Sequence, residues 1–198
     1  MVGKDYSVDE LVEEILKDKI IFEESGGGVT FSGGEPLLQS DFLVEVMGKL
    51  KKEDIHIAID TSGYVPYDNI RKIIEYTDLF LYDLKIADEQ KHMDYTGVSN
   101  KLIIDNLIKL SKGKSNINLR IPVIKGVNDS KRDMDEIIQI IDRTNIQSIS
   151  LLPYHNLSAH KYRKIDLAYE AFETPEAFEM NKIMHFFESK GYTVQIGG

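Results

Sequence analysis

The chain has 198 residues, of which 42% are apolar, and it carries a formal net charge of −9 with no cysteine. This length and apolar content predict one domain, residues 1–198, with a core of its own. The acidic balance argues against nucleic acid as a partner, because phosphate binding needs clustered Lys and Arg. No apolar run reaches the roughly 18 residues of a membrane span, and the first residues are too acidic for a signal peptide, so we expect a cytoplasmic protein without membrane contact.

Helical and strand patterns alternate along the chain. Apolar spacing predicts helices around residues 8–22, 40–50, 70–74, 102–110, 130–141 and 175–187. Short β-branched or continuous apolar runs predict strands at 29–31, 55–59, 79–82, 117–124, 146–152 and 192–196. Ser7 and Glu10 form a capping-box pattern before the first helix, Pro36 suits the start of a helical turn, and Ser40 is expected to cap the helix that follows.

This order of elements indicates the fold class. Apolar strands that alternate with helices are typical of a parallel sheet covered on both faces. Polar residues follow every strand, which fits a (β/α) barrel better than a doubly wound sheet. The chain is short for a closed barrel of about 250 residues, and its opening helix has no strand before it. We therefore expect an α/β fold, an incomplete parallel (β/α) barrel whose first strand is missing.

The turn Ser32-Gly33-Gly34-Glu35 is the first candidate site. A strand that stops at two glycines brings bare backbone to the carboxyl edge of the sheet, where barrels bind their ligands. Glu35 adds a negative charge at that edge. A tight turn with a surface acid explains the same residues without a ligand.

Polar groups also follow four later strands, in the segments Asp60-Thr61-Ser62-Gly63, Asp83-Leu84-Lys85, Arg120 and Pro153-Tyr154-His155. In a parallel barrel these groups and Glu35 converge on one mouth, which could clamp a zwitterion or another small polar molecule. Most of them also have a structural explanation as caps, solvated charges or loop residues. Arg120 is the exception, because a guanidinium inside an apolar strand needs a buried partner or a ligand. The histidines are scattered without a pair at ligand spacing, so the residues themselves predict no metal site.

Six blocks that occur in this order resemble the radical S-adenosylmethionine superfamily. Within it they resemble the glycyl radical enzyme activating enzymes, typified by the activators of pyruvate formate-lyase. The blocks are residues 28–39, 60–63, 83–85, 96–100, 120–124 with 128–129, and 152–155 with Lys161-Tyr162. The resemblance covers nearly the whole chain.

The resemblance implies a binding site for S-adenosylmethionine. The implied cofactor-binding residues are Gly33, Gly34, Glu35, Thr61, Asp83, Leu84, Lys85, Arg120 and His155. In the family the Gly-Gly-Glu motif binds the amino group, the Asp-Leu-Lys segment lies beside the ribose and carboxylate, and the lysine pairs with the carboxylate. Asp60, Thr61 and Asp83 match positions that hold a monovalent cation near the sulfonium.

The family reaction implies a [4Fe-4S] cluster that gives one electron to S-adenosylmethionine. The resulting 5′-deoxyadenosyl radical removes a hydrogen from a glycine of a partner enzyme, here one of the pyruvate formate-lyase type. The family holds its cluster with Cys-x-x-x-Cys-x-x-Cys, and this chain has no cysteine. We therefore expect the chain to be the C-terminal part of a longer polypeptide and to be inactive alone. Only the full-length protein would hold the cluster and take electrons from a flavodoxin or ferredoxin.

Two other functions remain open. A lysine at the end of an apolar barrel strand is what a class I aldolase needs, and Lys85 would then form a Schiff base that borohydride traps. The chain could also be a non-catalytic module that binds S-adenosylmethionine without chemistry.

Overall fold

The computed structural model describes residues 4–155 and 172–197. Contacts within the chain divide it into two compact units. The first unit comprises Met1–Tyr82 with Gly113–Ile117, and the second comprises Asp83–Lys112 with Asn118–Gly198. The registered strand pairs within each unit are parallel, which agrees with the predicted α/β class.

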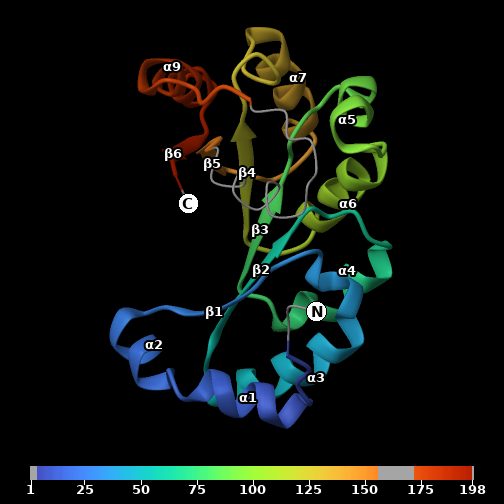
Figure 1. Cartoon of the computed structure of the whole chain (residues 1–198), viewed down its shortest axis with the longest axis vertical. Coiled ribbons are helices and arrows are strands. Elements are labelled where there is room, and N and C mark those ends of the chain that lie inside the picture. Colours follow the sequence, from blue (N-terminus) through green and yellow to red (C-terminus); the bar gives the residue numbers. More distant parts are fainter. Residues whose placement is uncertain (1–3, 156–171, 198) are drawn as a thin grey trace. The chain divides into compact units, whose positions relative to one another are not determined.

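The first unit is a parallel β-sheet covered by short helices. Its elements are α1 (Val8–Leu16), α2 (Lys19–Ser25), β1 (Gly28–Phe31), the 3-10 helix η1 (Pro36–Gln39), α3 (Ser40–Leu50), η2 (Lys51–Glu53), β2 (His56–Thr61), α4 (Tyr67–Ile73), η3 (Ile74–Tyr76) and β3 (Leu79–Asp83), whose last residue belongs to the second unit (Figure 1). β2 pairs with β1 and with β3, so that Ile59 lies opposite both Phe31 and Phe80. Helix α3 packs against α1 and α4. The apolar faces of β2 and α3 are buried, as Ile57 and Val46 illustrate.

In the first unit, one predicted helix boundary is confirmed and two are wrong. The Ser7 and Glu10 capping box is present, with the Glu10 carboxylate accepting the Ser7 N–H at 2.8 Å. The single opening helix that we expected is wrong, because the Asp18 N–H bonds back three residues to Ile15 and ends α1. Ser40 does not cap α3 either. Because η1 runs directly into α3, Ser40 is the first residue of that helix and not its N-cap. Its side chain is buried.

The second unit also combines parallel strands with helices. Its elements are α5 (Glu89–Thr96), α6 (Lys101–Ser111), β4 (Ile117–Val123), whose first residue belongs to the first unit, α7 (Lys131–Ile141), β5 (Ser148–Pro153), α9 (Ala177–Glu188) and β6 (Thr193–Ile196) (Figure 1). β5 pairs with β4 and with β6, so that Ser150 lies opposite both Arg120 and Gln195. Helix α9 packs against β5 and β6, where Phe187 is fully buried.

Helix α5 lies where the sequence pattern predicts neither a helix nor a strand. Asp88 caps it by accepting the Lys91 N–H at 2.7 Å, and Gly97 ends it with a left-handed φ of 79°. The last helix begins at Ala177, two residues after Pro175, because Glu176 takes the N-cap position. Among the helices formed by the described residues, none combines the length and apolar character of a membrane span.

Candidate functional site

The turn that follows β1 leaves backbone open to a ligand. Gly33 and Gly34 have left-handed φ values of 87° and 53°, which residues with a side chain rarely adopt. A methyl group built on either glycine would meet no heavy atom within 4 Å. Both glycines are exposed. The turn therefore offers peptide groups at the end of β1 with no side chain in front of them.

The carboxylate of Glu35 is fixed by its neighbours in the same unit. Oε1 accepts the Thr61 hydroxyl at 2.8 Å and the Leu37 N–H at 3.3 Å. Oε2 accepts both the backbone N–H and the hydroxyl of Ser62, at 3.0 and 2.7 Å. These donors fill the approximately four lone-pair sites of a carboxylate. Glu35 thus presents a negative charge in a fixed orientation.

The end of β2 supplies most of this support. Thr61 is almost fully buried, and its Oγ1 also accepts the Gly63 N–H at 2.9 Å. Asp60 accepts the Ser32 hydroxyl at 3.0 Å, which ties the glycine turn to β2. The sequence blocks contain Ser62 but do not predict a role for it, and the signal that could have identified it is its place beside Thr61 directly after the strand.

Tyr82 lies against Gly63, which follows β2. Its ring is fully buried, and burial together with the negative charge of Glu35 raises its pKa far above the usual value for a phenol. The phenol therefore stays neutral throughout the physiological range. A Cβ on Gly63 would lie 1.8 Å from the Tyr82 hydroxyl oxygen, so only glycine fits at position 63.

In the second unit, Asp83 brings together two of the predicted cations. Its Oδ1 accepts Nε and Nη2 of Arg120 at 2.8 and 2.7 Å, and its Oδ2 lies 3.1 Å from Nζ of Lys85. The side chains of Asp83 and Arg120 are 16% and 15% exposed, whereas that of Lys85 is 42% exposed. Arg120 therefore has a partly buried carboxylate partner, as a guanidinium in a strand requires. Lys85 remains accessible to an incoming anion.

The remaining predicted residues of the second unit are placed differently. The Leu84 side chain is buried in the core, so any ligand contact from this residue would come from its backbone. His155 is exposed at the end of β5, and no hydrogen bond joins it to another residue in the described part of the chain. Lys161 and Tyr162 lie outside the described residues.

The protein has no set of side chains for a bound metal cluster within its described residues. No three His, Cys, Asp or Glu side chains are grouped as metal ligands there. The expected monovalent cation at Asp60, Thr61 and Asp83 stays a prediction.

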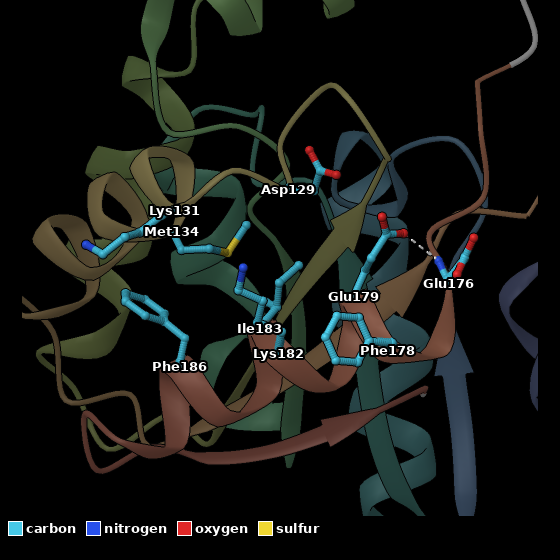
Figure 2. A pocket seen from close by; sticks show the side chains of 9 residues that line it. All are labelled: Asp129, Lys131, Met134, Glu176, Phe178, Glu179, Lys182, Ile183 and Phe186. Atoms are coloured by element: carbon cyan, nitrogen blue, oxygen red, sulfur yellow. Dashed lines mark hydrogen bonds between the residues drawn. The ribbon is translucent and has the colours of Figure 1, made fainter.

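A separate hollow lies between helices α7 and α9 of the second unit. Its volume is about 610 Å³. Figure 2 shows the residues that line it, which are Asp129, Lys131, Met134, Glu176, Phe178, Glu179, Lys182, Ile183 and Phe186. None of the predicted site residues lines it. We therefore keep the candidate site at the strand ends.

Comparison with known proteins identifies the family. A family model described as the Radical SAM superfamily matches residues 2–141. The chain therefore belongs to the radical S-adenosylmethionine superfamily, and its relatives place it with the glycyl radical enzyme activating enzymes. It is 47% identical to the trans-4-hydroxy-L-proline dehydratase activating enzyme of Clostridioides difficile, over 100% of this chain and 67% of that protein. It is 38% identical to the pyruvate formate-lyase-activating enzyme of Clostridium pasteurianum, over 85% and 71% of the two chains.

Solved structures support the same fold. A domain of a pyruvate-formate lyase-activating enzyme from Bacteroides vulgatus ATCC 8482 matches with a TM-score of 0.74 and 28% identity, over 87% of this chain and 99% of that one. The predicted fold class, an incomplete parallel (β/α) barrel of the radical SAM type, is thereby confirmed. The chain spans 54% to 67% of the length of the first three curated relatives that it matches.

The family's cofactors are S-adenosylmethionine and a [4Fe-4S] cluster. The residues present suit S-adenosylmethionine in kind, because the open turn at Gly33 and Gly34 offers backbone acceptors to an ammonium and Lys85 offers a cation to a carboxylate. They do not fit the cluster, which is bound through cysteine thiolates that the sequence lacks.

Proposed function

We propose that this chain supplies the S-adenosylmethionine-binding part of a glycyl radical enzyme activating enzyme. The complete activity would cleave S-adenosylmethionine, with one added electron, into methionine and a 5′-deoxyadenosyl radical. That radical would take a hydrogen atom from a glycine of the partner, leaving 5′-deoxyadenosine and a glycyl radical. The observation that carries the proposal is the 47% identity to an activating enzyme over the whole chain.

The groups at the strand ends support a proposed contact for each part of the amino acid moiety of S-adenosylmethionine. Backbone acceptors of the turn at Gly33 and Gly34 would bind the ammonium, and the fixed charge of Glu35 would attract it. Lys85 would pair with the carboxylate, because its side chain is 42% exposed and its Nζ is held on one side by Asp83. Thr61, Leu84, Arg120 and His155 complete the proposed set, the first by supporting Glu35.

The proposed partner is a glycyl radical enzyme. Identity favours a dehydratase that acts on trans-4-hydroxy-L-proline over an enzyme of the pyruvate formate-lyase type, at 47% against 38%. Affinities of this chain for the two purified enzymes, measured side by side, test that order. Tighter binding to the pyruvate formate-lyase would reverse it.

We further propose that this chain alone binds S-adenosylmethionine without cleaving it, because it has no cysteine for the cluster that supplies the electron. A flavodoxin or ferredoxin would then serve only a protein that carries those cysteines. The test is anaerobic iron–sulfide reconstitution followed by reduction with dithionite. Formation of 5′-deoxyadenosine above the level without protein would overturn the proposal.

Calorimetric titration with S-adenosylmethionine tests the binding site. Lys85→Gln should weaken binding about 5- to 10-fold, the effect of losing one charge-assisted contact of about 1 kcal/mol in a partly exposed site. Lys101→Gln is the matched control, because Lys101 pairs with Glu89 at 2.9 Å but is 75% exposed and belongs to none of the proposed contacts. Equal affinities of the two variants would refute the role of Lys85. A carbonyl substrate trapped on Lys85 by borohydride would instead support the aldolase alternative.

A further inference from the structure

Two buried asparagines hold the segment that carries Lys85. Nδ2 of Asn128 donates to the backbone carbonyls of Lys85 and Pro122, each at 2.6 Å. Its Oδ1 accepts the Ile124 N–H at 2.7 Å. The residue is 1% exposed. One side chain therefore ties the end of the β3 segment to the end of β4.

Asn100 continues this arrangement along the same segment. Its Nδ2 donates to the carbonyls of Ile86 and Ala87 at 3.0 and 2.7 Å, and the residue is also 1% exposed. Three consecutive carbonyls, those of residues 85–87, thus accept hydrogen bonds from two primary amides. Each amide uses both of its N–H groups on these carbonyls or on that of Pro122.

Strand-like alternation of burial continues beyond the end of β3. Leu84 and Ile86 are buried, whereas Asp83 and Lys85 are only partly buried. Alternation of this kind places the two charged side chains on one face and the two apolar ones on the other. β3 itself ends at Asp83. The asparagine amides therefore take the place of strand partners for carbonyls that would otherwise be unsatisfied.

We propose that Asn128 and Asn100 are positioning residues that hold Lys85 for the carboxylate of its ligand. The proposal rests on the proposed function, in which Lys85 binds that carboxylate. Asn128 donates to the carbonyls of both Lys85 and Pro122, so it fixes the Lys85 backbone to β4. The same strand carries Arg120, whose guanidinium contacts Asp83, as does the ammonium of Lys85. Without the Asn128 side chain, the Lys85 carbonyl loses its hydrogen bond, the backbone there is no longer held in place, and the Lys85 ammonium samples many positions.

The first experiment measures Lys85 without any ligand. Trace acetylation with acetic anhydride, read by mass spectrometry, reports how accessible and unconstrained each lysine is. Asn128→Ala and Asn100→Ala should raise the acetylation rate of Lys85 at least threefold relative to Lys51, which pairs with Asp78 in the first unit. Asn145→Ala is the control, because it removes a side-chain hydrogen bond to the Ser111 carbonyl within the second unit, to which Lys85 also belongs.

Unchanged labelling of Lys85 in both folded variants would overturn the proposal. Circular dichroism establishes that each variant is folded. If both variants fail to fold, the asparagines are structural residues and the proposal is likewise overturned. Labelling that rises in one variant, with the control unchanged, supports a positioning role for that asparagine alone.

The second experiment compares S-adenosylmethionine with its decarboxylated form, which lacks only the carboxylate. Asn128→Ala should weaken binding of the first about 3- to 10-fold and leave the second unchanged. In a Lys85→Gln background the same substitution should have no further effect, because Asn128 acts through Lys85. An equal loss for both ligands would show a general structural effect and refute the proposal. If the parent chain does not distinguish the two ligands, the proposed function of Lys85 fails, and the acetylation rates still decide whether the asparagines position it.

Discussion

Replacing Gly63 with alanine should destabilise the first unit by about 2–4 kcal/mol. Gly63 has a left-handed φ of 71°, which costs a residue with a Cβ about 1 kcal/mol. The new Cβ would also lie 1.8 Å from the Tyr82 hydroxyl oxygen and 2.2 Å from Cζ of the same ring. Tyr82 is fully buried, so relieving this overlap requires movement of the core, which typically costs about 1–3 kcal/mol.

Gly26→Ala separates the steric effect from the backbone effect. Gly26 belongs to the same unit and has a similar φ of 65°, but a Cβ there would meet no atom within 4 Å. It should therefore cost only about 1 kcal/mol. Urea unfolding of both variants, followed by far-UV circular dichroism, gives the difference between their free energies of unfolding. A difference below about 0.5 kcal/mol would show that contact with Tyr82 is not what requires glycine at position 63.

Two further substitutions test the carboxylates that the fold holds in place. Glu35→Gln should lower the free energy of unfolding, measured with urea, by about 1–3 kcal/mol, because the amide would place N–H groups against donors such as Ser62. Glu24→Gln, at an exposed site, should have no measurable effect. Burial raises the pKa of Asp133, but hydrogen bonds led by that from Lys91 outweigh this effect and hold the pKa below its usual value. The resulting stability is present above the unfolded pKa of about 3.9 and is lost as the pH falls through the folded pKa. The loss of unfolding free energy caused by Asp133→Asn, measured with urea, should therefore shrink between pH 5 and pH 3. A loss that stays constant over this range would contradict the ion-pair explanation.

The sequence predicted the strands well because their signal is local. The continuous apolar run 79–82 and the run 117–124, in which every second residue is apolar, lie within one residue of β3 and β4. The capping box of Ser130 was also predictable, since its partner Asp133 lies three residues away. Helix α5 was missed because it buries little apolar surface, with His92 its only buried residue. Only its caps identify it.

The strand-end residues were predictable in position but not in their partners. A polar residue directly after a strand in a βα unit lies at the carboxyl edge of the sheet, and Asp83 does so. The sequence could not show that two nitrogens of Arg120 donate to Asp83, because that pairing depends on side-chain rotamers and on the register between distant segments. The same limit concealed the roles of Asn100 and Asn128, whose carbonyl partners at residues 85–87 lie 13 to 43 residues away in sequence.

The bonding of Glu35 changes how its proposed role in the site should be understood. A carboxylate that accepts hydrogen bonds from Leu37, Thr61 and Ser62 has no unused acceptor that a ligand ammonium could simply occupy. Those donors leave its charge intact, and in a partly buried turn that charge still attracts a cation across a few ångströms. The backbone acceptors of the glycine turn would then make the direct contacts, with Glu35 supplying the field. On this basis Glu35→Gln should weaken S-adenosylmethionine binding at low ionic strength more than at high ionic strength, and a loss independent of salt would indicate a direct contact instead.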